Sequence, residues 1–94
     1  MKTFLLEGDI NHQTSPVVRS EILKKLSRQN GLQLDLSNVT SIDSSGLAIL
    51  VEAVAEARKT NRKIRLVRFS DQVLKLIRLA HLEDVFSIRV QTVH

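Results

Sequence analysis

The sequence contains no cysteine, tryptophan or tyrosine, and these absences exclude several kinds of site. Without cysteine there are no disulfides, thiolate metal ligands, iron–sulfur clusters or cysteine nucleophiles. The only aromatic residues are three phenylalanines, so the core must be built from leucine, valine and isoleucine. Exposed aromatic platforms for stacking single-stranded nucleic acid are correspondingly scarce.

Long apolar runs are missing as well. No stretch approaches the roughly 18 apolar residues that a membrane-spanning helix needs. Glu7-Gly8-Asp9 also interrupts the N-terminal segment before an apolar region of signal-peptide length can form. We therefore expect a cytoplasmic protein without membrane insertion. Its 94 residues, 43% hydrophobic and 26% charged, without linker or repeat, predict one domain spanning residues 1–94 and leave the oligomeric state open.

Acidic residues are scarce in one segment of the second half of the chain, residues 58–78, although the net charge of the whole chain is only +4. Between residues 58 and 78 the single acid Asp71 stands against eight cationic residues: Arg58, Lys59, Arg62, Lys63, Arg65, Arg68, Lys75 and Arg78. Such a segment is either a set of solvated positions or a surface for nucleic acid, anionic lipid or an acidic partner. Because no helix-turn-helix pattern accompanies it, we predict no direct binding of nucleic acid.

The residue patterns of common enzymes are missing too. The three glycines stand alone, so neither type of glycine-rich phosphate loop is present. His12, His81 and His94 lie far apart in the sequence and form no metal-binding pair. The Gly-x-Ser-x-Gly pattern is absent, and no histidine is placed in the sequence to activate Ser44 or Ser45. We therefore expect no enzymatic activity, no cofactor and no metal.

In the first third of the chain the pattern predicts a strand and then a helix. A short strand at residues 3–6 is expected to end at Glu7-Gly8-Asp9. A helix is expected to start at Thr14-Ser15-Pro16, because serine can cap a helix and proline suits the first helical position. Asn30-Gly31 then supplies a left-handed stop.

The middle of the chain predicts the same two elements again. Leu32, Leu34 and Leu36 alternate with polar residues as in a strand, which Ser37-Asn38 is expected to end. After a short approach at residues 39–42, a helix follows with an apolar stripe of Leu47, Leu50, Val51, Val54 and Ala55. We assign Leu47 and Leu50 to packing, and we expect the helix to stop at Thr60-Asn61.

The last third predicts a strand containing Ile64, Leu66 and Phe69. Ser70-Asp71 is expected to start a further helix, and Phe86, Ile88 and Val90 alternate as a last strand. The side chains expected to face inward from that helix are Val73, Leu74, Ile77 and Ala80. Alternation of strands and helices predicts an α/β fold, a mostly parallel sheet of four to five strands with helices packed on it through right-handed crossovers.

A hydroxyl-rich turn, Asp43-Ser44-Ser45-Gly46, directly precedes the second predicted helix. In one interpretation Asp43 or Ser44 caps the helix, and Gly46 allows a tight approach to a neighbouring element. In the other, a hydroxyl at a helix N-terminus is a phosphate acceptor, because free N–H groups and the helix dipole tolerate the charge of about −1.5 to −2. Modification there would act on a docked partner without unfolding the protein.

From this turn outward the chain resembles the STAS domain family, which contains the bacterial anti-sigma factor antagonists. The resemblance rests on Leu34-Asp35-Leu36-Ser37-Asn38-Val39 and Ile42-Asp43-Ser44-Ser45-Gly46-Leu47-Ala48, and continues through Ile64-Arg65-Leu66-Val67 and residues 79–86. Gly8-Asp9-Ile10 and residues 14–19 are similar to the family's first strand and helix. The resemblance covers most of the chain and implies a single, minimal STAS domain.

The antagonist branch of the family implies a role for each residue of the turn. There the serine directly after the aspartate is phosphorylated by a kinase that is also the anti-sigma factor, and it corresponds to Ser44. Asp43, Ser45 and Gly46 complete the partner-binding turn. The resemblance implies that the unphosphorylated protein binds this serine kinase and frees the sigma factor for transcription. The phosphorylated protein lets go until a phosphatase resets it.

A second branch is resembled about as well. Gly46-Leu47-Ala48 and the alanine-rich helix with Glu52, Glu56, Ala57 and Arg58 are similar to the STAS subunit that binds the ATPase of an ABC transporter for lipid asymmetry in the outer membrane. In that branch the hydroxyl turn is a contact surface and need not be phosphorylated.

Overall fold

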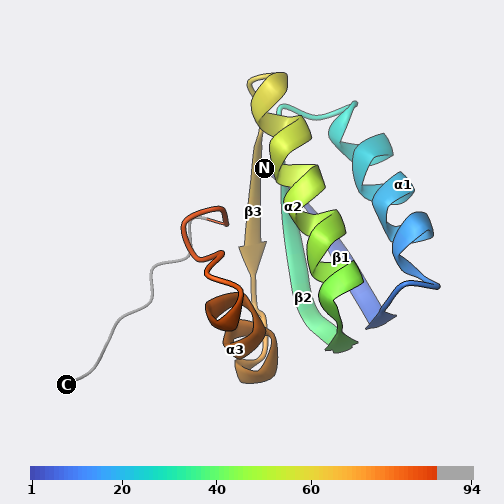
Figure 1. Ribbon diagram of the computed structural model, residues 1–94. Coiled ribbons are helices and arrows are strands. Elements are labelled where there is room, and N and C mark those ends of the chain that lie inside the picture. The colour runs from blue at the N-terminus through green and yellow to red at the C-terminus, as the bar shows by residue number, and fades with distance from the viewer. Residues whose placement is uncertain (87–94) are drawn as a thin grey trace.

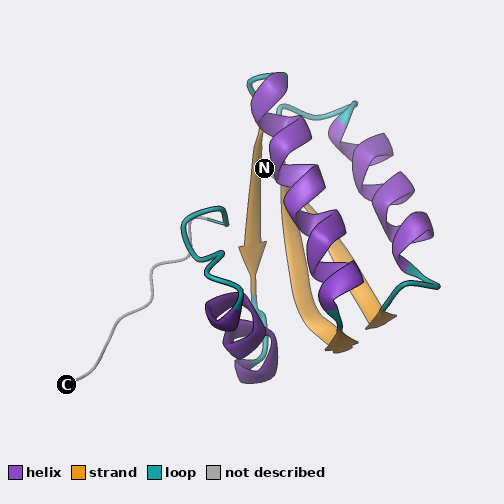
Figure 2. Ribbon diagram, in the orientation of Figure 1, coloured by secondary structure: helices purple, strands orange, loops and turns teal. Residues whose placement is uncertain are grey.

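The computed structural model describes residues 1–86, which form strands and helices in alternation (Figure 1, Figure 2). The elements are β1 (Lys2–Ile10), α1 (Ser15–Leu26), β2 (Gly31–Ile42), α2 (Ser44–Lys59), β3 (Lys63–Val67) and α3 (Asp71–Leu79). The strands are parallel and lie in the order β1-β2-β3. The predicted α/β fold with a parallel sheet is confirmed, with three strands among residues 1–86 instead of the expected four to five.

The predicted last strand lies outside the described residues, except for its first residue. Phe86 is 3% exposed and lies in a turn after α3, so its placement in a strand is wrong. Within residues 1–86 no helix combines the length and the apolar character that crossing a bilayer requires.

Helices α1 and α2 lie side by side over one face of the sheet (Figure 1). An ion pair links them where Arg19 Nε approaches Glu52 Oε2 to 2.6 Å. The core lies between these helices and the sheet, and central strand β2 supplies three of its fully buried leucines, the alternating set at 32, 34 and 36 that the sequence predicts. Leu47 and Leu50 of α2 join the same core, which confirms their assignment to packing.

Strands β1 and β2 are longer than predicted. The expected strand ends at Glu7-Gly8-Asp9 and at Ser37-Asn38 are wrong, because both strands continue through these residues. The register between the strands shifts twice instead, once before Glu7 and once after Gly8. Gly8 has a φ of 74°, a left-handed value that glycine adopts readily, so the irregularity is absorbed as a bulge inside the strand.

The ends of α1 also differ from the prediction. Thr14, not Ser15, occupies the cap position, and Ser15 is the buried first residue of the helix. The Thr14 hydroxyl makes no capping bond. Its oxygen accepts from Asn11 N at 2.9 Å, and its O–H donates to the Asp9 carbonyl oxygen at 2.7 Å. The helix ends at Leu26, and Gly31 is the first residue of β2 rather than a left-handed stop.

Helix α3 starts where the sequence predicts. The Ser70 hydroxyl accepts a hydrogen bond from Val73 N at 3.2 Å. Of the four side chains expected to face inward, Val73 and Ile77 are buried, Leu74 is half-buried, and Ala80 lies beyond the helix and is exposed. Placing Phe69 in the preceding strand is wrong, because β3 ends at Val67.

One carboxylate is buried in the sheet. Asp35 of β2 is 4% exposed, accepts a hydrogen bond from Ser37 N at 2.9 Å and pairs with Arg68, whose Nη1 lies 3.1 Å from Oδ2. Hydrogen bonds from Ser37, supported by the charge of Arg68, lower the pKa of Asp35 below its ordinary value of 3.8. The pair therefore ties the central strand to the segment that follows β3.

The lowered pKa of Asp35, caused first by the hydrogen bonds from Ser37 and then by Arg68, predicts a stability loss in acid. A carboxyl group whose pKa is lowered by folding stabilises the protein above its unfolded pKa of about 3.9, and the contribution is lost as the pH falls through the lower folded pKa. We expect Asp35→Asn to be less stable than the wild type at pH 7 and to lose less stability between about pH 5 and pH 2. Urea denaturation across this range measures both effects.

Glu21→Gln, which removes an exposed carboxylate of α1, is the control. If Asp35→Asn loses as much stability in acid as the wild type, the acid-dependent loss does not come from Asp35.

Candidate functional site

The hydroxyl-rich turn lies where β1 and β2 end and α2 begins. In Figure 1 the arrowheads of both strands and the first turns of α1 and α2 lie at the same end of the molecule. This edge is where open parallel sheets commonly bind their ligands, because the loops after the strands meet there. The structure thus brings Asp43, Ser44, Ser45 and Gly46 together at this edge as one continuous turn.

Asp43 caps α2, which decides between the two cap candidates. Its backbone is extended, with φ of −107° and ψ of −173°, and its Oδ1 accepts a hydrogen bond from Gly46 N at 3.0 Å. Its own N–H donates to the Ile10 carbonyl oxygen at 3.2 Å. Asp43 therefore joins the end of β1 to the first turn of α2.

Ser44 and Ser45 are the first two residues of α2. The side chain of Ser44 is exposed and that of Ser45 is half-buried. Within the part of the chain that the structure describes, neither hydroxyl takes part in a hydrogen bond. Their backbone N–H groups have no partner inside the helix, as is general for a first turn. Ser44 is therefore the more accessible nucleophile or contact group of the two.

Gly46 is buried and permits the close approach that the sequence predicts. A Cβ atom at this position would overlap the Ile10 carbonyl oxygen and lie 2.7 Å from Ile42 Cγ1 and 2.8 Å from Ile10 Cγ2. Such separations are too short for carbon atoms at contact, which prefer about 3.5–4.0 Å. Only glycine lets α2 pack this closely on the ends of β1 and β2.

Three further residues at this edge were missed by the sequence analysis. Asp9 Oδ1, at the end of β1, accepts hydrogen bonds from Thr40 Oγ1 at 2.6 Å and from Ser41 Oγ at 2.8 Å, both near the end of β2. These two hydrogen bonds lower the pKa of Asp9 below its ordinary value of 3.8, and the bond from Thr40 has the larger effect. The available signal was an acid in the first strand and two hydroxyls just before Asp43.

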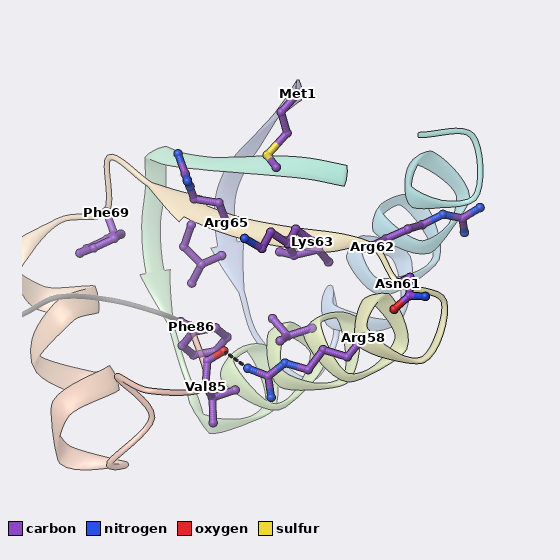
Figure 3. A pocket seen from close by; sticks show the side chains of 12 residues that line it. Met1, Arg58, Asn61, Arg62, Lys63, Arg65, Phe69, Val85 and Phe86 are labelled. Carbon is purple, nitrogen blue, oxygen red and sulfur yellow. Dashed lines mark hydrogen bonds between the residues drawn. The ribbon is translucent and has the colours of Figure 1, made fainter. Parts of the chain in front are cut away.

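At the other end of α2, part of the cationic segment lines a pocket of about 850 Å³ (Figure 3). Among the described residues that line it are four cations and no acid: Arg58, Arg62, Lys63 and Arg65. Val54, Leu66 and Phe86 add apolar surface. Figure 3 shows the Arg58 guanidinium directed at Val85, whose carbonyl oxygen accepts its Nη2–H at 3.3 Å. The helical rise places this pocket about 20 Å from Ser44.

Metal ligands do not gather in the part of the chain that the structure describes. No group of three or more histidine or acidic residues there is arranged to hold a metal ion. His12 and His81 are both exposed, and His94 lies outside the described residues.

Comparison with protein families and curated sequences gives concordant matches. A family model described as "Mlab, STAS domain" matches residues 3–90. The anti-sigma-B factor antagonist of Listeria monocytogenes is 31% identical over 84 residues, which cover 87% of this chain and 73% of that protein. The Bacillus subtilis protein of the same name is 23% identical over 87 residues, covering 93% of this chain and 80% of that protein.

Solved structures show the same fold. The anti-sigma factor antagonist SpoIIAA in its unphosphorylated form superposes with a TM-score of 0.74 at 18% identity, covering 87% of this chain and 73% of its own. An anti-sigma factor antagonist from Mycobacterium paratuberculosis gives a TM-score of 0.75 at 23% identity, covering 89% and 72%. At these identities the likeness establishes the fold.

The close packing around Gly46 predicts that any side chain at this position lowers the stability of the fold. We expect Gly46→Ala to lower the free energy of unfolding by about 1–3 kcal/mol, because the added methyl overlaps the Ile10 carbonyl, and Gly46→Val to lower it further. Urea denaturation measures the change. Ala48→Val, at an exposed position of the same helix, is the matched control and should cost less than about 1 kcal/mol. An unchanged stability of Gly46→Ala would contradict the close approach.

Proposed function

The chain belongs to the STAS domain family, and on that premise we propose that it is an anti-sigma factor antagonist switched by phosphorylation of Ser44. In this proposal the unphosphorylated protein binds an anti-sigma factor that is also a serine kinase, through a surface formed by Asp43, Ser44, Ser45 and Gly46. Phosphorylation of Ser44 releases the partner. The protein acts in the cytoplasm as a binding module and catalyses no reaction itself.

The exposed Ser44 hydroxyl at the first position of α2 is the observation that carries this proposal. A kinase can reach it without unfolding the turn, because among residues 1–86 the hydroxyl has no hydrogen bond to break. The first turn of α2 contains no acidic residue, and the helix dipole favours an anion at this end. A phosphoryl group on Ser44 is therefore compatible with the fold.

The same group would change the surface that a partner meets. Phosphorylation adds a charge of about −1.5 to −2 beside the exposed carboxylate of Asp43. A partner that packs closely on a neutral hydroxyl would then bury an unpaired dianion, which is costly. Release follows from this local change, while the anchoring of the turn by Asp43 and Gly46 stays as it is.

The second candidate function is the STAS subunit that binds the ATPase of an ABC transporter. The observation in its favour is the outer face of α2, where Ala48, Glu52, Ala55 and Glu56 are all exposed. The prediction that Ala55 belongs to the apolar stripe is wrong, because Ala55 is exposed. The small side chains of Ala48 and Ala55 would let a partner approach the helix closely. Here Ser44 would be a contact residue and no switch.

Affinity capture with two baits tests the switch and separates the two candidates. We expect the unmodified protein to recover a kinase-like ATPase from a lysate of its native host, and Ser44→Glu to recover much less. With the purified partner, Ser44→Ala should bind as tightly as the wild type and resist phosphorylation, whereas stoichiometric phosphorylation should weaken binding at least tenfold, or about 1.4 kcal/mol. Ser20→Ala, which removes an exposed hydroxyl of α1 outside this surface, is the control and should remain a substrate.

Two outcomes would count against this function. Equal affinity of the unmodified and the fully phosphorylated protein would reject the switch. Recovery of an ABC transporter ATPase by both baits would favour the second candidate.

A further inference from the structure

We propose that Asp9 determines which hydroxyls at this edge can carry a phosphoryl group, excluding Thr40 and Ser41 and leaving Ser44. The inference rests on the proposed function and adds a residue that decides its specificity. Five hydroxyl side chains that are exposed or half-buried lie where β1 and β2 end, so a kinase has several candidate acceptors there: Thr14, Thr40, Ser41, Ser44 and Ser45.

Asp9 engages three of these five hydroxyls. Its Oδ1 accepts from Thr40 at 2.6 Å and from Ser41 at 2.8 Å, and its backbone carbonyl oxygen accepts from Thr14 at 2.7 Å. Thr40 and Ser41 are both exposed, so burial alone would not protect them from a kinase. Their contact with a carboxylate is what distinguishes them from Ser44.

A phosphoryl group on Thr40 or Ser41 would meet this carboxylate directly. The hydroxyl oxygen would lose the proton that it now donates, and a group of charge about −1.5 to −2 would stand against Asp9 in place of a hydrogen bond. Like charges at this range repel strongly even near the surface. Asp9 is ionised at neutral pH, since the same two hydrogen bonds lower its pKa.

Ser44 has different surroundings, although it follows Asp43. The Asp43 carboxylate accepts the Gly46 N–H through Oδ1 and, among residues 1–86, makes no hydrogen bond to the Ser44 hydroxyl. Ser44 lies at the N-terminus of a 16-residue helix, next to backbone N–H groups without intrahelical partners, where an anion is favoured. Asp9 therefore acts by exclusion, because it makes two exposed hydroxyls poor acceptors and leaves the helix terminus as the site of modification.

Site-specific incorporation of phosphoserine tests the inference without any kinase. Phosphoserine is placed at position 41 or at position 44 in the wild type, in Asp9→Asn and in Glu7→Gln. Asn can still accept hydrogen bonds but carries no charge. Glu7→Gln removes an exposed carboxylate from the same strand and is the matched control.

In the wild type we expect phosphoserine at 41 to lower Tm by at least about 4 °C and phosphoserine at 44 to change it by less than about 2 °C. Asp9→Asn should remove at least half of the shift caused at 41, and Glu7→Gln should leave it unchanged. If the chain with phosphoserine 41 does not fold in the wild type, folding of the same chain with Asp9→Asn supports the inference, and failure of both overturns it. An equal shift in the wild type and in Asp9→Asn also overturns it.

A second arm uses the kinase recovered by affinity capture. Mass spectrometry should find phosphate at Ser44 alone in the wild type and additionally at Thr40 or Ser41 in Asp9→Asn. Modification confined to Ser44 in both proteins would overturn the role of Asp9. If Ser44 is not a kinase substrate at all, the proposed function fails, and the Tm comparison still decides whether Asp9 excludes phosphate from position 41.

Discussion

The contact between Gly46 and the carbonyl group of Ile10 determines how the rest of the site is arranged. Ile10 is the last residue of β1 and lies opposite Ile42, the last residue of β2. Its carbonyl oxygen accepts the Asp43 N–H at 3.2 Å and also contacts Gly46, where no side chain intervenes. One backbone group thus holds both ends of the turn, and Ser44 and Ser45 lie between two anchored residues.

Because of this anchoring, the turn keeps its position without any contribution from the Ser44 side chain. The groups that hold the turn are the Ile10 carbonyl, the Asp43 N–H and carboxylate, and the bare backbone of Gly46. A modification of Ser44 therefore alters the charge of the surface but removes none of the contacts that position α2. A switch between two binding states on one rigid fold requires this separation, which the hydroxyls of Thr40 and Ser41 do not have.

The charges at the two ends of α2 have the signs that the helix dipole favours. The carboxylate of Asp43 lies at the N-terminus, and Arg58 and Lys59 lie in the last turn. Arg58 thus has a structural role at the end of α2 in addition to lining the pocket. Phosphate on Ser44 would increase the existing charge separation. In the proposed switch, phosphorylation therefore adds negative charge at a helix end that already favours anions.

The sequence predicted the parts of the site that depend on neighbours in the chain. Asp43 and Gly46 were identified because a cap and a glycine directly precede an apolar stripe, and both signals are local. Asp9 was missed because Thr40 and Ser41 are 31 and 32 residues away. From the sequence alone, Gly8 is typical of a strand end. In the structure, residues on both sides of Gly8 pair with β2, so Gly8 lies in a bulge inside the strand. A turn and a bulge use the same residue types, so only the presence of a paired strand distinguishes them. The contact of the Asp9 carboxylate with two hydroxyls of β2 likewise depends on the register between the strands, and no local sequence pattern encodes that register.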